Sequence, residues 1–262
     1  MQNCETPSSG ASLPIPLQGK WGPANGYAGR AHSPEVHTFF MTAPLLRRLL
    51  AEFIGTAFLL AGVIGSGIMA ERLTDDVGLQ LLANAGATVG VLYAIIIMFG
   101  PVSGAHFNPA VTLSDAALTK RSWSDVSPYI VAQIAGGVVG VMVANLMFEL
   151  DAVNMSDKVR DGSGQYIAEV VATFGLVFLI FSLVRTGRDA LAAGAVAAYI
   201  GGAYWFTSST SFANPAVSVA RTLSNTFAGI DPGSMPMFIV MQLIGAALAV
   251  AAIRVIYPND CA

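Results

Sequence analysis

Phe212-Ala213-Asn214-Pro215-Ala216-Val217 decides the fold, because the chain carries this stretch twice. The earlier copy is His106-Phe107-Asn108-Pro109-Ala110-Val111. Asn is a preferred N-cap, and Pro suits the first helical turn, where its missing N–H would be unpaired anyway. Each copy therefore predicts the start of a short helix, and each lies between long apolar segments.

Composition places the chain in a membrane. Of its 262 residues, 54% are hydrophobic and 11% are charged, and the mean hydropathy is +0.63. Soluble domains carry about 25% charged residues. The net charge of −3 gives no basis for nucleic-acid binding. We expect no metal, no cofactor and no enzymatic activity, because the two cysteines stand at opposite ends, the histidines are scattered, and no catalytic or nucleotide-binding motif occurs.

The apolar pattern predicts an all-α membrane protein with six transmembrane helices. Each apolar span has close to the ~20 residues that a bilayer requires. The spans cover residues 45–70, 79–100, 127–149, 166–185, 189–207 and 235–257. Two shorter stretches, 108–118 and 214–224, begin at the Asn-Pro pairs and are predicted to be re-entrant half-helices.

The two halves of the membrane region repeat each other. Ala51-Glu52-Phe53-Ile54-Gly55-Thr56 is echoed by Ala168-Glu169-Val170-Val171-Ala172-Thr173, and each precedes an Asn-Pro-Ala-Val. Because each half has three spans, the second half must be inverted relative to the first. We therefore expect a disordered tail over 1–43 and one channel domain over 44–258, with repeats at 44–150 and 160–258.

Basic residues predict the orientation. One side of the membrane would carry Arg47, Arg48, Lys120, Arg121, Arg185, Arg188 and Arg254, and the other Arg72, Lys158 and Arg160. Cytoplasmic loops carry the excess of Lys and Arg, so both termini are expected in the cytoplasm, with the protein in the cell membrane.

Half-helices that enter from opposite faces point their N-termini at each other. Each N-terminus carries about half a positive charge, so a pore between them would repel cations and orient neutral solutes that bear hydroxyl groups. The amides of Asn108 and Asn214 can cap their helices through oxygen while offering N–H donors. An Asn-Pro pair that merely starts a buried helix is the alternative, and a matched pair in an inverted repeat favours the pore.

The sequence over about residues 45–257 resembles the aquaporin and aquaglyceroporin channels, the major intrinsic proteins. The motifs that carry the resemblance are Ser103-Gly104-Ala105-His106-Phe107-Asn108-Pro109-Ala110-Val111-Thr112, Asn214-Pro215-Ala216 and the two Ala-Glu…Thr segments. The resemblance implies a pore in each chain and assembly as a homotetramer.

Three polar residues inside the apolar region have two interpretations each. Glu52 and Glu169 are either hydrogen-bond acceptors for the irregular backbone before each half-helix or ion-coupling sites, and their symmetric placement favours the first. His106 either lines the pore toward the cytoplasm, as in similar channels, or tethers the loop backbone.

In this family a narrower filter lies outward of the Asn-Pro-Ala pair. Fixed offsets from the two asparagines place its four positions at Thr88, Gly202, Ser211 and Val217. Most members have Arg where this chain has Val217, and water-selective members have a bulky aromatic and His in place of Thr88 and Gly202. The resemblance therefore implies a wide, uncharged filter.

Two features near the second motif remain open. Arg221 could reach the outer mouth of the pore, but snorkelling toward the interface is the favoured role. The run Thr207-Ser208-Ser209-Thr210-Ser211 is either a pore-lining polar stripe or a plain external loop, and its descent to the half-helix favours the first.

Passive conduction of water and small neutral solutes is the predicted function. A wide, uncharged filter favours glycerol-like polyols and metalloid hydroxides such as arsenite, and the Asn-Pro-Ala-Val second motif resembles a bacterial subgroup linked to arsenic handling. The alternatives are a secondary transporter and a non-conducting structural membrane protein of the same fold.

Overall fold

A computed structural model describes residues 43–119 and 121–258. The helices are α2 (Leu45–Leu73), α3 (Val77–Ser103), α4 (Pro109–Leu118), α5 (Val126–Met147), α6 (Ser163–Arg185), α7 (Ala192–Phe206), α8 (Pro215–Ala220) and α9 (Met235–Ile256). Short 3₁₀ turns, η2 (Trp123–Asp125), η3 (Asp189–Leu191) and η4 (Arg221–Leu223), precede α5 and α7 and follow α8. The predicted disordered tail lies outside the described residues except for Ala43.

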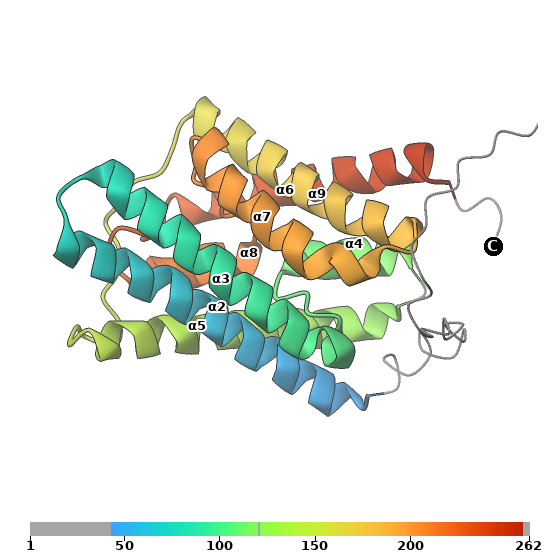
Figure 1. Cartoon of the computed structure of the whole chain (residues 1–262), viewed down its shortest axis with the longest axis horizontal. Coiled ribbons are helices and arrows are strands. Elements are labelled where there is room, and N and C mark those ends of the chain that lie inside the picture. The colour runs from blue at the N-terminus through green and yellow to red at the C-terminus, as the bar shows by residue number, and fades with distance from the viewer. Residues whose placement is uncertain (1–42, 120, 259–262) are drawn as a thin grey trace, which may run out of the picture.

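The long helices run side by side along the longest axis of the molecule (Figure 1). The two short helices, α4 and α8, lie between the long ones and toward opposite ends of the bundle. The first residues of α2 and the last residues of α9 lie at the same end. The arrangement therefore matches six passes with two half-helices inside the bundle.

The spans largely follow the predicted ranges. Five helices (α2, α3, α6, α9, and α5 together with its preceding 3₁₀ turn) are long and apolar enough to cross a membrane. The remaining span, α7, has 15 residues in α-helical conformation and gains a further turn from η3. The second half-helix is shorter than predicted, because α8 has only 6 residues before it tightens into η4.

Both half-helices begin where the Asn-Pro pairs predict. The side-chain oxygen of Asn108 accepts the Ala110 N–H at 2.9 Å, and that of Asn214 accepts the Ala216 N–H at 3.0 Å. Pro109 and Pro215 occupy the first helical position, where no N–H is needed. Local capping chemistry therefore fixes both starts.

Glycines allow the helices of each half to pack closely. A Cβ on Gly136 would lie 2.2 Å from the carbonyl oxygen of Phe53, and one on Gly140 would lie 2.2 Å from that of Ala57. These contacts join α5 to α2. Gly245 on α9 does the same in the second half, 2.5 Å from the carbonyl oxygen of Val170 on α6. Gly86 and Gly90 on α3 differ from these, because a Cβ at either position would meet no atom within 4 Å in the described chain.

Gly140→Ala is expected to destabilise the protein by about 1–3 kcal/mol, because the new methyl group overpacks a contact with backbone. Gly90→Ala is the matched control, since its Cβ meets no atom within 4 Å. Thermal unfolding in detergent should show a lower midpoint for Gly140→Ala alone. Equal midpoints for the two variants would contradict the close approach of α2 and α5.

Candidate pore between the two half-helices

The N-termini of the half-helices meet through two crossed hydrogen bonds. Asn108 Nδ2 donates to the carbonyl oxygen of Ala213 at 2.8 Å, and Asn214 Nδ2 donates to that of Phe107 at 2.8 Å. Each side-chain oxygen is already the N-cap of its own helix. One N–H of each amide therefore remains for a solute, at the place where the two helix dipoles present positive charge.

Glu52 holds the loop before the first half-helix. Its carboxylate accepts hydrogen bonds from the backbone N–H groups of His106 and Phe107 at 3.0 and 2.7 Å. It also accepts from Ser103 Oγ at 2.6 Å and from Gln133 Nε2 at 2.8 Å. The side chain is fully buried and does not line the cavity described below.

Glu169 has the same place in the second half. It accepts from the backbone N–H groups of Phe212 and Ala213 at 3.0 and 2.9 Å, and from Gln242 Nε2 at 2.6 Å. Both carboxylates are thus occupied by donors from the irregular backbone, which is the arrangement expected for the structural interpretation.

Two glutamines complete this network, and sequence reasoning missed them. Gln133 Nε2 also donates to Thr112 Oγ1 at 2.9 Å, and Gln242 Nε2 donates to Ser218 Oγ at 2.8 Å. Each glutamine links the buried acid to the first turn of a half-helix. The available signal was a glutamine inside the last apolar span of each half, Gln133 in 127–149 and Gln242 in 235–257.

The loops that lead into the half-helices have matching backbone conformations. Residues three and one before each asparagine have positive φ: Ala105 (52°) and Phe107 (50°) in the first loop, and Ser211 (52°) and Ala213 (47°) in the second. Non-glycine residues persist in this region only where surrounding contacts hold them. The acid and asparagine hydrogen bonds supply those contacts.

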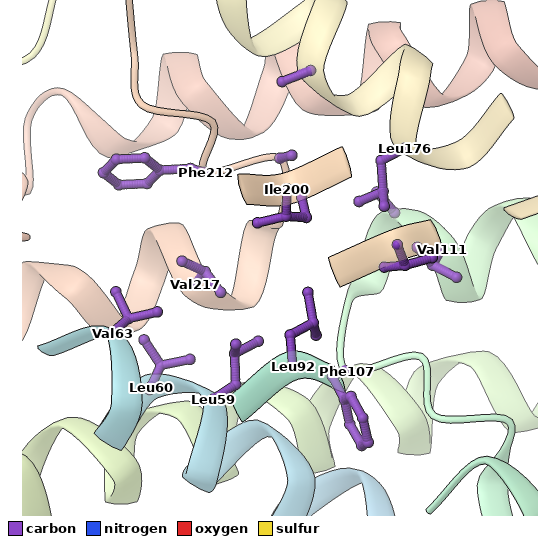
Figure 2. Packing of buried hydrophobic residues seen from close by; sticks show 14 of the residues in the cluster. Leu59, Leu60, Val63, Leu92, Phe107, Val111, Leu176, Ile200, Phe212 and Val217 are labelled. Carbon is purple, nitrogen blue, oxygen red and sulfur yellow. The ribbon is translucent and has the colours of Figure 1, made fainter. Parts of the chain in front are cut away.

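A cavity of about 640 Å³ passes beside these groups. It extends from Arg121 and Asp189 at one end, past Asn108 and Asn214, to Arg221 at the other. Its wall is mostly aliphatic and includes Leu59, Val63, Leu92, Val111, Leu176, Ile200 and Val217. Figure 2 shows several of these side chains between Phe107 on one side and Phe212 on the other. The cavity thus combines an apolar wall with a few polar groups.

Three of the four predicted filter residues line this cavity: Thr88, Ser211 and Val217. Gly202 does not, because it is exposed on α7 and a Cβ there would meet nothing within 4 Å. Tyr204 lines the cavity instead, and its hydroxyl lies 3.1 Å from Thr88 Oγ1. A helix turns about 100° per residue, so residues two positions apart, such as Gly202 and Tyr204, lie on nearly opposite faces of α7. A fixed offset from Asn214 therefore selects the wrong face when the register differs by two residues.

His106 lies toward the other end of the cavity, and its ring contacts side chains of α4. It lines the cavity, and its Nδ1 lies 3.0 Å from Thr112 Oγ1. Its Nε2 lies 3.5 Å from Asp115 Oδ2, a carboxylate that also pairs with Arg121. This end therefore carries charges of both signs.

The end of the cavity beyond Val217 is basic. Arg221 lines the cavity, and Lys158 and Arg160 in the loop before α6 lie nearby, each bonded to the carbonyl oxygen of Phe227. Burial lowers the pKa of Arg160 to about 10, so this guanidinium stays charged at neutral pH. Burial is the main cause that lowers the pKa of Lys158, and the positive charge of Arg160 lowers it further. Within the described chain none of the three basic residues forms an ion pair.

Pro109, Ala110, Pro215 and Ala216 are buried behind the asparagines and do not line the cavity. Among residues 43–119 and 121–258, no group of three or more His, Cys, Asp or Glu residues is placed to hold a metal ion.

Comparison with known proteins agrees with this geometry. The profile of the family described as "Major intrinsic protein" matches residues 40–210. The chain belongs to the major intrinsic protein family. It is 49% identical over 210 residues to Aquaglyceroporin AqpS of Rhizobium meliloti (strain 1021), covering 80% of this chain and 90% of that protein. It is 28% identical over 231 residues to the Glycerol uptake facilitator protein of Streptococcus pneumoniae, covering 79% of this chain and 97% of that protein.

A solved structure shares the fold. The aquaglyceroporin from Plasmodium falciparum matches 81% of this chain and 97% of its own with a TM-score of 0.64, at 17% identity. The major intrinsic proteins are membrane channels. This chain is accordingly a multi-pass, passive channel for water and small solutes, and not an enzyme.

Proposed function

We propose that this major intrinsic protein conducts glycerol-like polyols and metalloid hydroxides such as arsenite, As(OH)₃, together with water. One observation carries the proposal: a single cavity combines an aliphatic wall with amide donors at Asn108 and Asn214. A solute with several hydroxyl groups can turn its oxygens to the amides and its remaining surface to the wall. The relatives named as an aquaglyceroporin and a glycerol facilitator support this class of solute.

The selectivity region is proposed to be Thr88, Ser211 and Val217, with Tyr204 in the place first assigned to Gly202. Val217 supplies no charge and no hydrogen-bond donor at this level. Tyr204 makes the region less open than four small residues would, while its hydroxyl and that of Thr88 keep one side polar. The filter therefore carries no charge at the level of Val217, and the aromatic side chain of Tyr204 forms part of its wall.

The favoured assembly is a homotetramer in the cell membrane with both termini in the cytoplasm. Large apolar side chains exposed along α3 and α9, such as Leu82, Tyr93 and Leu248, are suited to lipid or to neighbouring subunits. The excess of Lys and Arg on the side that holds both termini supports the orientation. The matched Glu–Gln networks support repeats at 44–150 and 160–258.

Ion-coupled transport is the alternative with the clearest structural test. It would need Glu52 or Glu169 to bind and release an ion. Both carboxylates already accept hydrogen bonds from two backbone N–H groups and a glutamine amide, so protonation would break several contacts at once. The same contacts fit a fixed structural role. A non-conducting structural protein would have no need of the open cavity.

Stopped-flow assays on proteoliposomes test the proposal. Water, glycerol and arsenite should each cross faster than in empty liposomes, without saturation and independently of an imposed proton gradient. Asn108→Leu/Asn214→Leu, which removes the amide donors, should slow all three. Flux that follows the proton gradient would establish a transporter, and flux equal to that of empty liposomes would establish a non-conducting protein.

A further inference from the structure

Arg221 lies inside the bundle, contrary to the expectation that it snorkels toward the interface. The residue is only 2% exposed. It nevertheless lines the same cavity as Asn214 and Val217. A buried cation that borders a solute pathway calls for a functional explanation.

The helical register places Arg221 directly outward of Val217. The backbone N–H of Arg221 donates to the carbonyl oxygen of Val217, so the i to i+4 relation of an α-helix holds across the end of α8. Four residues correspond to about one turn, or about 6 Å along the axis. Arg221 thus stands on the same face as Val217, one turn nearer the mouth.

Neighbouring groups hold the guanidinium in place but leave part of it free. Its central carbon lies 3.4 Å from the centroid of the Phe212 ring, and its Nε donates to the carbonyl oxygen of Ala228. Nη1 and Nη2 have no hydrogen-bond partner in the described chain, yet neither is among its fully buried unpartnered atoms. These two nitrogens are therefore accessible donors.

A second polar group without a partner borders the same cavity. Ser211 is 4% exposed, and its Oγ is buried with no hydrogen-bond partner in the described residues. It directly precedes Phe212, the residue that supports the guanidinium. A buried hydroxyl without a partner costs free energy unless a solute or water satisfies it.

We propose that Arg221 supplies the cation barrier and the outer solute-binding donors of this channel, one helical turn outward of the position where Val217 leaves the filter uncharged. Ser211 Oγ provides a second contact for the oxygen atoms of the same solutes, which are polyols and metalloid hydroxides. This inference rests on the proposed function and names the residue that sets its selectivity.

The surrounding charges strengthen such a barrier. The Arg160 guanidinium lies 5.1 Å from the same Phe212 ring, and Lys158 lies in the same loop as Arg160. Glu71, whose carboxylate accepts the Phe227 N–H, is an acidic neighbour of Lys158, but it forms no ion pair with it in the described chain. Three cationic side chains therefore gather around the Phe212 and Phe227 rings at this mouth, and low-dielectric walls increase their effect on an approaching cation. The acidic Asp157 and Asp161 flank Lys158 and Arg160 in the same loop, but both are exposed and neither lines the cavity.

The test compares ion leakage with neutral flux in proteoliposomes. Sodium and proton leakage of Arg221→Met, normalised to the water permeability of the same variant, should exceed that of the wild type by about tenfold or more, as expected for loss of a unit charge beside the path. Arg221→Gln keeps a donor for the Ala228 carbonyl and should leak to a similar degree. Arg221→Lys should stay near the wild-type value.

Two further variants locate the effect. Arg72→Met removes a charge from an exposed arginine that does not line the cavity, and its leakage should equal that of the wild type. Val217→Arg/Arg221→Val moves the charge one turn inward and should restore low leakage. If the wild type conducts glycerol normally and folded Arg221→Met and Arg221→Gln leak no more than the wild type, the role of Arg221 is overturned while the proposed function stands. Absent glycerol and arsenite flux in the wild type would instead overturn the proposed function.

Discussion

Val217→Arg is expected to reduce glycerol flux by about tenfold or more while it lowers water flux only a few-fold. Val217 is buried at the cavity wall, one helical turn from Arg221. A second guanidinium on this face would occupy cross-section that a three-carbon solute needs and water does not. It would also repel Arg221, because like charges four residues apart on a helix are neighbours.

Val217→Met separates size from charge in this experiment. Met adds length without charge or hydrogen-bond donors, so it should narrow the path without the electrostatic effect. We expect glycerol flux of Val217→Met to fall between the wild type and Val217→Arg, with water flux close to normal. If Val217→Arg lowers water and glycerol flux by the same factor and the protein remains folded, Val217 lies outside the constriction.

Glu52→Gln is expected to lower the free energy of unfolding by about 2–4 kcal/mol, because hydrogen bonds to a buried charged acceptor are strong and their donors would be left unpaired. The carboxylate faces four donors: two backbone N–H groups, Ser103 Oγ and the Gln133 amide. A glutamine would oppose some of these donors with an N–H of its own. The loop before Asn108 would then lose its support, and flux should fall together with stability.

Glu71→Gln is the matched control for this experiment. Glu71 is exposed, and its described hydrogen bond is to the Phe227 N–H at 2.9 Å. Thermal unfolding in detergent should show a large loss for Glu52→Gln and little change for Glu71→Gln. If Glu52→Gln keeps wild-type stability but loses a proton dependence of flux that the wild type shows, ion coupling through Glu52 is favoured instead.

Much of the pore follows from local chemistry that a sequence displays directly. The Asn-Pro pairs fixed where both half-helices begin, because N-capping and the missing proline N–H act within a few residues. The repeated Glu52 and Glu169 indicated loop acceptors before each half-helix, and both carboxylates contact those loops. Apolar length gave the helical membrane class, with α7 shorter than expected.

The sequence did not reveal the roles of Gln133 and Gln242, and it placed Gly202 in the filter where the structure has Tyr204. Both differences have the same physical cause. Gln133 and Gln242 join acid and half-helix across different helices, and no local pattern shows which buried amide will face which partner. Gly202 was placed by an offset from Asn214, and such an offset holds only if the intervening loop keeps the same length and path. Here the register of α7 turns Tyr204 toward the cavity.

The sequence by itself determined a membrane channel class, two inward-starting half-helices and a second motif without the usual arginine. These properties depend on hydropathy and capping, which are read along the chain. Only the tertiary structure decided which side chains meet around the cavity: Tyr204 beside Thr88, and Arg221 above the Phe212 ring. These contacts depend on the rotation of each helix about its axis and on the path of each loop. Both set where a side chain lies in space independently of its spacing in the sequence.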